Sequence, residues 1–265
     1  MRIQRFSGRL IAAAAVALVA CGGAGGSSSN PAPTADVGSG QLQGAGATFP
    51  EPFYTRAFYA YNQKYRQVSV NYQAIGSGGG IQAFTKGTVD FGASDVPMTA
   101  AEIQAAGGED SLVQLPTILG VESIAYNLPG VDRLQLDGTA LASIYLGTIK
   151  KWNDPAIVAL NGGARLPATD ITVVHRSDGS GTTYAFTDYL SKVSPEWKSR
   201  VGTAKSVQWP AGVGAAQNAG VGQQVKSTEG AIGYVELAYV VQSQLRQAYL
   251  KNPAGRFLQA TLDGA

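Results

Sequence analysis

The chain has 265 residues, and its 20 Lys and Arg stand against 18 Asp and Glu, so the formal charge is only +2. Because a nucleic-acid partner requires a basic surface, this balance argues against nucleic-acid binding. The chain has one cysteine and one histidine, which excludes a disulfide framework and leaves too few ligands for a typical zinc site.

The N-terminal residues have the pattern of an export signal. Arginines precede an apolar run at residues 10–20, which is too short to span a bilayer as a mature helix. The run ends in "LVAC", which resembles a bacterial lipobox, so we expect a signal peptide at 1–20 and a lipid on Cys21. The alternative is an ordinary signal peptide followed by a chance cysteine. Residues 21–40 are rich in Gly and Ser, which is typical of a flexible tether.

Beyond residue 40, strand patterns alternate with helix patterns. Short β-branched or apolar runs predict strands at 68–76, 89–94, 171–176 and 230–240. Amphipathic spacing predicts helices at 52–65, 80–86, 100–106, 139–145, 154–160 and 182–192. This alternation predicts an α/β fold with largely parallel sheets.

One local design occurs three times, at 44–58, 75–84 and 176–186. Each stretch joins a glycine loop that carries Ser or Thr to the start of a helix, and the third also carries Arg176. The first turn of a helix leaves backbone N–H groups unpaired and carries partial positive charge. Glycine lets the backbone come close to a ligand. The three loops together therefore predict a site for one small anion.

Nucleotide sites fit these loops poorly. The loop "SDGSGTT" lacks the lysine of a P-loop, and "GAGATF" has Phe49 where a dinucleotide fingerprint has its third glycine.

An enzyme site is also poorly supported. A serine hydrolase would need His175, Asp178 and Ser180 to form a triad, yet they lie within six residues and no G-x-S-x-G elbow is present. No carboxylates cluster at metal-ligand spacing, so we expect neither a metal nor a cofactor.

Several longer motifs resemble one family. The motifs "GAGATFPEPFY", "VNYQAIGSGGGIQAF", "VDFGASDVPM", "LPTILGVESIAYN", "LASIYLGTIKKWNDPAI", "HRSDGSGTTYAFTDYL" and "GAIGYVELAY" run in order along the chain. Together they resemble the bacterial phosphate-binding proteins of the Pst ABC phosphate importer. The resemblance implies a two-lobed type II periplasmic-binding-protein fold with the ligand in the cleft between the lobes. It implies lobe I at 41–119 and lobe II at 120–240, with a hinge crossing near 115–126.

The resemblance also implies a set of phosphate ligands. By motif these are Thr48, Phe49, Ser77, Asp95, Arg176, Ser180, Gly181 and Thr182. Asp178 is expected to hold the guanidinium of Arg176, whose planar fork suits two phosphate oxygens. Asp95 would accept the proton that phosphate still carries at neutral pH. Sulfate has no such proton, so Asp95 would reject it. The alternative role for Asp95 is to cap the helix that follows it.

The implied function is binding of phosphate and its delivery to a membrane permease by an exported, lipid-anchored, monomeric protein of the periplasm or cell surface. Members of the family usually continue beyond the point where this chain ends. We therefore expect residues 241–265 to begin a segment that returns to lobe I, and that lobe to be incomplete. The alternatives are a surface or adhesin-like lipoprotein that does not transport, a non-functional truncated product, an esterase acting on phosphate esters, and a receptor for another oxyanion.

Overall fold

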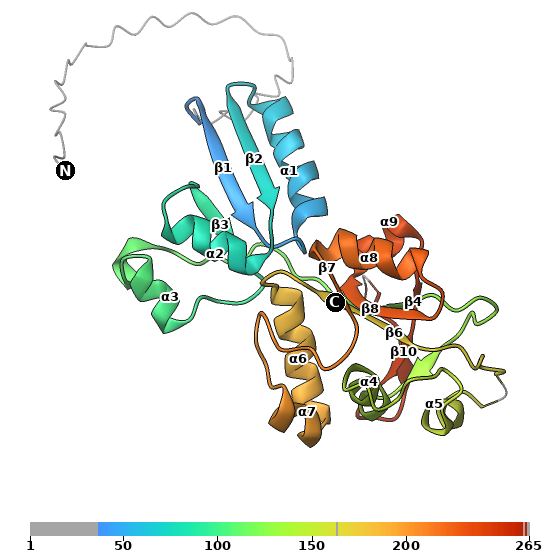
Figure 1. The fold of residues 1–265 in the computed structure, drawn as a ribbon. Coiled ribbons are helices and arrows are strands. Elements are labelled where there is room, and N and C mark those ends of the chain that lie inside the picture. The colour runs from blue at the N-terminus through green and yellow to red at the C-terminus, as the bar shows by residue number, and fades with distance from the viewer. Residues whose placement is uncertain (1–36, 163, 262, 264–265) are drawn as a thin grey trace, which may run out of the picture. The chain divides into compact units, whose positions relative to one another are not determined.

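The computed structural model describes residues 37–162, 164–261 and 263. The expected signal peptide, Cys21 and most of the tether lie outside these residues. The described chain forms three sheets with helices packed against them (Figure 1). Among the described residues, no helix is long and apolar enough to cross a membrane.

The first sheet has three parallel strands in the order β2-β1-β3. They are β1 (Gly40–Gly46), β2 (Val68–Ala74) and β3 (Phe91–Ala93). Helix α1 (Glu51–Lys64) joins β1 to β2, and α2 (Ser77–Thr85) joins β2 to β3. In parallel strands the carboxyl ends meet at one edge of the sheet, so this connectivity gathers the loops after β1, β2 and β3.

The second sheet has five strands in the order β7-β6-β8-β4-β9. Its strands are β4 (Glu122–Tyr126), β6 (Thr172–Arg176), β7 (Val213–Ala215), β8 (Ala231–Glu236) and β9 (Arg246–Gln247). Strands β6, β7 and β8 are parallel, whereas β4 runs antiparallel to both of its neighbours. The α/β class is confirmed, but this sheet is mixed rather than largely parallel.

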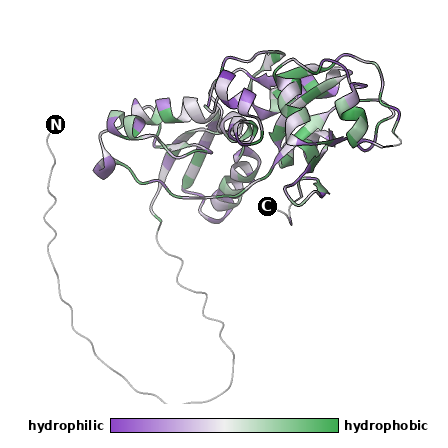
Figure 2. Ribbon diagram, turned by 90° about the horizontal axis from the view of Figure 1, so that it is seen from below, coloured by the Kyte–Doolittle hydropathy of each residue, from purple (hydrophilic) through white to green (hydrophobic). Residues whose placement is uncertain are grey.

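Apolar side chains on both faces of the second sheet build the core. Ile232 and Tyr234 of β8 face one cluster, while Ala231 and Val235 face the other. A strand buried on both faces reads as one continuous apolar run, and Figure 2 shows hydrophobic residues gathered in this part of the chain. The helices around the sheet are α4 (Gly138–Tyr145), α5 (Pro155–Leu160), α6 (Gly181–Val193), α7 (Pro195–Arg200), α8 (Gln217–Ser227) and α9 (Leu237–Ser243).

The remaining elements are short. The third sheet consists of β5 (Gln135–Leu136), β10 (Tyr249–Lys251) and β11 (Phe257–Leu258). Helix α3 (Ala100–Ala105) follows β3, and a 3₁₀ turn spans Glu109–Ser111.

Two sequence predictions require correction. The strand expected at 230–240 ends at Glu236, because the Glu236 carboxylate accepts the N–H of Ala238 and begins α9. The first glycine loop is not a loop at its start, since Gly44–Gly46 is the end of β1. Glycine is needed there because a Cβ on Gly46 would lie 2.0 Å from the carbonyl oxygen of Ala93 in the neighbouring strand.

Candidate anion-binding site

The hydroxyl of Ser77 links the first sheet to the second. Ser77 begins α2 after β2, and its side chain is buried. Its Oγ accepts the backbone N–H of Gly181 at 3.1 Å and the backbone N–H of Asp95 at 3.2 Å. Three of the expected ligands, which lie far apart in the sequence, therefore meet at one atom.

Arg176 is a buried cation whose orientation is fixed. It ends β6 and is only 3% exposed. Its Nε donates to Oδ1 of Asp178 at 2.7 Å, its second terminal nitrogen donates to Oδ2, and the third nitrogen lies 3.4 Å from Oγ1 of Thr182. Burial alone would raise the pKa of Asp178, but the hydrogen bonds and charge of Arg176 outweigh burial and lower it. Asp178 thus stays ionised and holds the guanidinium, as the sequence suggested.

Helix α6 contributes its N-terminus to the same place. Ser180 is the N-cap residue, and its Oγ accepts the N–H of Thr183 at 3.0 Å. Ser180, Gly181 and Thr182 are all buried. The dipole of a helix favours negative charge at such an end by about 0.3–1 kcal/mol.

Thr48 reaches the site through a residue that the sequence did not single out. Thr48 Oγ1 accepts an N–H of the side-chain amide of Asn218, the second residue of α8, at 2.8 Å. The Thr48 carbonyl accepts the hydroxyl of Tyr239 at 2.6 Å. Phe49 follows Thr48, and its ring lies against Gly120. Asn218 follows neither a predicted strand nor a glycine-serine loop, so no local signal pointed to it.

A cavity of about 230 Å³ is lined by the carboxyl groups of Asp95, Glu122 and Glu236. The same cavity borders Phe49, Gly181 and Thr182. Burial raises the pKa of Asp95 to about 6, although Arg176 opposes the shift. Burial also raises the pKa of Glu236 to about 7 and that of Glu122 well above its usual range. The two glutamates were missed, although a charged residue inside an apolar run is itself a signal.

Asp95 does not cap the following helix, so that alternative is wrong. Thr99 is the N-cap of α3, where it forms a capping box with Glu102. The Asp95 carboxylate is instead held by the hydroxyl of Ser77 and the backbone N–H of Thr182, which lower its pKa against the effect of burial. Its Oδ1 is enclosed and has no hydrogen-bond partner within the described chain. One carboxylate oxygen is therefore left to accept a proton from a ligand.

The residues considered for a hydrolase do not form a triad. His175 stacks on Trp209 with ring centroids 4.7 Å apart, and its Nδ1 lies 3.1 Å from the carbonyl oxygen of Arg176. Burial lowers the pKa of His175. Asp178 is bound to Arg176, and Ser180 caps α6, so each residue that a triad would require has another partner. Over the ranges that the structure covers, no group of His, Cys, Asp and Glu could hold a metal ion.

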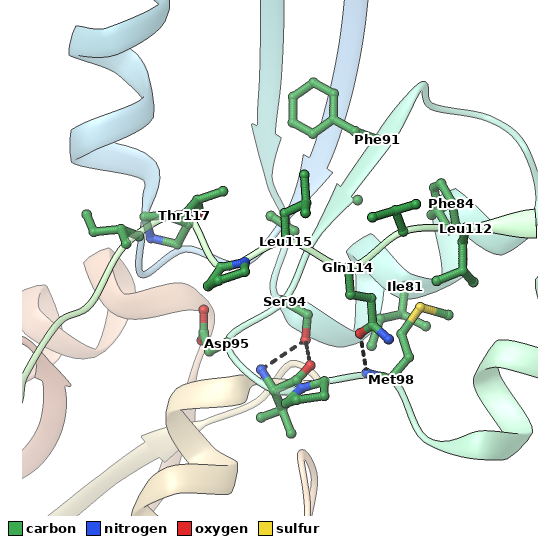
Figure 3. Close-up of a pocket in the computed structure, with 18 of the residues that line it drawn as sticks. Ile81, Phe84, Phe91, Ser94, Asp95, Met98, Leu112, Gln114, Leu115 and Thr117 are labelled. Carbon is green, nitrogen blue, oxygen red and sulfur yellow. Dashed lines mark hydrogen bonds between the residues drawn. The ribbon is translucent and has the colours of Figure 1, made fainter. Parts of the chain in front are cut away.

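A second, larger hollow of about 820 Å³ reaches Asp95 from the side of the first sheet. Figure 3 shows Phe84, Phe91 and Leu115 around it and Asp95 at its edge. Residues 112–118 line it without forming a helix or a strand, and Leu115 is 74% exposed. The side-chain oxygen of Gln114 ties this segment to the N–H of Met98 at 2.8 Å. The Asp95 carboxylate therefore lies between an apolar hollow and the polar site.

Comparison with known proteins shows the fold and the family of this chain. The family model described as a PBP superfamily domain matches residues 31–262. Solved structures with a similar fold include a phosphate-binding protein from Stenotrophomonas maltophilia, with a TM-score of 0.61 and 23% identity over 86% of this chain and 69% of that one. Another is an ABC-type phosphate transport receptor from Vibrio cholerae, with a TM-score of 0.56 and 19% identity over 85% and 80%. These likenesses show the type II periplasmic-binding-protein fold.

Curated relatives are closer in sequence. The phosphate-binding protein PstS of Pasteurella multocida is 52% identical over 224 residues, which are 84% of this chain and 64% of the relative. PstS2 of Mycobacterium bovis is 38% identical over 256 residues, which are 93% of this chain and 69% of the relative. The chain thus spans a little under two thirds of the length of the first relative and a little over two thirds of the length of the second. It belongs to the PBP superfamily and, within it, to the family of the PstS phosphate-binding proteins.

Proposed function

We propose that the chain binds inorganic phosphate at the site around Arg176 and delivers it to the permease of an ABC-type importer. The observation that carries the proposal is a buried arginine, oriented by Asp178, at the N-terminus of a helix. Charge-assisted hydrogen bonds from a planar guanidinium suit a tetrahedral oxyanion. The surrounding hydroxyls of Thr48 and Thr182 add neutral donors, and Ser77 holds the Asp95 carboxylate and the N–H of Gly181 beside them. Binding rather than turnover is the function, in keeping with the other members of the family.

The proposed ligands are those expected from the motifs: Thr48, Phe49, Ser77, Asp95, Arg176, Ser180, Gly181 and Thr182. They divide between residues 41–119 and residues 120–240, which we infer to be two lobes that close on the anion. Asp95 provides selectivity over sulfate, because its free Oδ1 can accept a proton that phosphate carries and sulfate lacks. Export, a lipid on Cys21 and a monomeric state complete the proposal and follow from the N-terminal pattern and from the family.

Calorimetric titration of phosphate into the parent chain and into Arg176→Ala tests the site. Two charged hydrogen bonds to the anion contribute about 1.5–3 kcal/mol each, so we expect the variant to bind at least about 100-fold more weakly. Arg200→Ala is the matched control, because Arg200 forms an exposed ion pair with Glu196. A variant isotherm at Arg176 that overlays the parent's, with both proteins folded, would refute the site.

Titration of phosphate and sulfate into Asp95→Asn tests the selectivity. Asparagine keeps the size of the side chain, removes the charge that repels sulfate and offers it an amide donor. We expect the ratio of the phosphate and sulfate dissociation constants to change by at least about 100-fold in favour of sulfate. An unchanged ratio would remove the role given to Asp95.

A further inference from the structure

Asn218 lies at the centre of the hydrogen bonds that join the predicted ligands. It is fully buried at the start of α8. Its Oδ1 accepts the backbone N–H of Glu236 at 3.1 Å. That bond fixes which end of the amide faces the site, because a backbone N–H requires an oxygen opposite it. The amide nitrogen must therefore point toward the threonines.

The amide nitrogen of Asn218 donates to two hydroxyl oxygens. Its distance to Oγ1 of Thr48 is 2.8 Å, and its distance to Oγ1 of Thr182 is 3.5 Å. The backbone N–H of Asn218 also lies 3.3 Å from Oγ1 of Thr48, and Arg176 lies 3.4 Å from Oγ1 of Thr182. Each threonine oxygen thus receives two donors.

A hydroxyl has one proton to give and two lone pairs that accept. When donors already occupy the lone pairs, the hydroxyl proton has to point to another acceptor. For Thr48 and Thr182, the site between them and Arg176 is where the predicted anion lies. Asn218 therefore determines the direction in which both protons point.

The neighbouring residue fixes the position of this turn. Gln217 has a φ of +65°, a left-handed conformation that is costly for a residue other than glycine. Its backbone N–H donates to Oδ1 of Asp178 at 2.9 Å, and its side-chain amide donates to the carbonyl of Ala74 at 2.5 Å. The turn is thereby bound both to the partner of Arg176 and to the end of β2, next to the loop that carries Ser77.

We propose that Asn218 is a positioning residue of the anion site: its amide occupies the threonine oxygens and so reserves the hydroxyl protons of Thr48 and Thr182 for the bound phosphate. The proposal rests on the proposed function. It adds a residue that contacts the hydroxyl donors Thr48 and Thr182 and does not contact the phosphate.

Two substitutions separate this role from a purely structural one. In Asn218→Ala each hydroxyl loses one of its two donors and can turn, so phosphate affinity should fall about tenfold. In Asn218→Asp the carboxylate accepts both hydroxyl protons and turns them away from the anion, so the fall should be at least about 100-fold. A role in packing alone predicts that affinity follows thermal stability in each variant.

Asn161→Asp is the matched control for stability. Asn161 is also buried, its Oδ1 accepts the N–H of Gln135, and its nitrogen donates to the carbonyls of Gln135 and Ile157. We expect this variant to melt at a lower temperature than the parent while its phosphate dissociation constant stays within about threefold. An equal loss of affinity in Asn161→Asp would show that reduced stability, and not donor orientation, weakens binding.

A double-mutant cycle tests whether Asn218 acts through Thr48. In a Thr48→Val background the hydroxyl is gone, so adding Asn218→Ala should cost less than about threefold in affinity. Full additivity would overturn the proposal, as would Asn218→Ala and Asn218→Asp both binding within threefold of the parent. If Asn218→Asp does not fold, the cycle with Asn218→Ala decides alone.

The two proposals fail in different ways. A parent chain that binds phosphate while the Asn218 variants match it overturns the positioning role and leaves the proposed function intact. A parent that binds sulfate in place of phosphate overturns the proposed function, and the same variants then test Asn218 with sulfate. A parent that binds neither anion overturns both.

Discussion

At the scale of single residues, Asp95 is a carboxyl group in an unfavourable place. Burial raises its pKa to about 6 from the ordinary value of 3.8, despite the nearby charge of Arg176 and the hydrogen bonds from Ser77 and Thr182. A buried charge of this kind costs folding free energy. The residue proposed to confer selectivity should therefore reduce the stability of the protein when no anion is bound.

Asp95→Asn should stabilise the anion-free protein at neutral pH. Between about pH 4 and pH 6 the native state holds a proton on Asp95 that the unfolded state has released. The free energy of unfolding contributed by this group therefore falls as pH rises through that window, by up to about 3 kcal/mol. Asparagine removes this dependence. Chemical denaturation from pH 3.5 to 7.5 measures it.

The control for this prediction is Asp170→Asn, because Asp170 forms an exposed ion pair with Lys151. Surface pairs of this kind contribute about 0–1 kcal/mol, so the variant should follow the parent at every pH. Asp95→Asn and parent curves that stay parallel from pH 3.5 to 7.5 would show that the native pKa of Asp95 is not raised.

At the scale of elements, the position of Ser77 depends on close packing of α2 against the first sheet. A Cβ on Gly80 would lie 2.4 Å from the Cα of Gly46 and 2.7 Å from the carbonyl oxygen of Ala45. Both atoms belong to the backbone of β1, so they cannot move aside as a side chain would. Glycine at position 80 thus allows α2 to lie where its first residue reaches Gly181.

Gly80→Ala should move α2 away from β1 and so lower both stability and anion affinity. Overpacking of this kind lowers the free energy of unfolding by about 1–3 kcal/mol. Displacement of Ser77 should in addition weaken phosphate binding by about tenfold, which corresponds to one lost hydrogen bond. Thermal melts and titrations of the same preparations measure the two effects.

Gly40→Ala provides the comparison within β1, because a Cβ there meets no atom within 4 Å. That variant should keep the parent's stability to within about 0.5 kcal/mol and its full affinity. If Gly80→Ala and Gly40→Ala behave alike, close packing of α2 is not what positions Ser77.

At the scale of the whole chain, the proposed site lies between the parallel three-stranded sheet and the mixed five-stranded sheet. The first sheet borders the apolar hollow, and Leu115 is exposed beside it. The second sheet is covered on both faces. Because the proposed ligands come from both sheets, binding an anion should stabilise the contacts between the sheets, and melting of the whole protein should report it.

The sequence predicted the α/β class and the helices and strands with strong periodicity, such as β6 and α6. It also pointed to the loops around Ser77 and Arg176, because their residue types carry the chemistry locally. It did not reveal Asn218, Glu122 or Glu236. The role of Asn218 arises from contacts between segments far apart in the chain, such as that with Thr48, and such contacts leave no local pattern. The two glutamates were missed although each is a charged residue inside an apolar run.

The measurement that tests the central proposal most directly is a thermal melt of the full chain in three buffers: without added anion, with millimolar phosphate and with millimolar sulfate. A ligand present at 100 times its dissociation constant adds about 2.7 kcal/mol to the free energy of unfolding. We predict one cooperative transition that phosphate raises and sulfate leaves unchanged. The same transition temperature in all three buffers would contradict a phosphate site around Arg176, and an equal rise with both anions would contradict selectivity through Asp95.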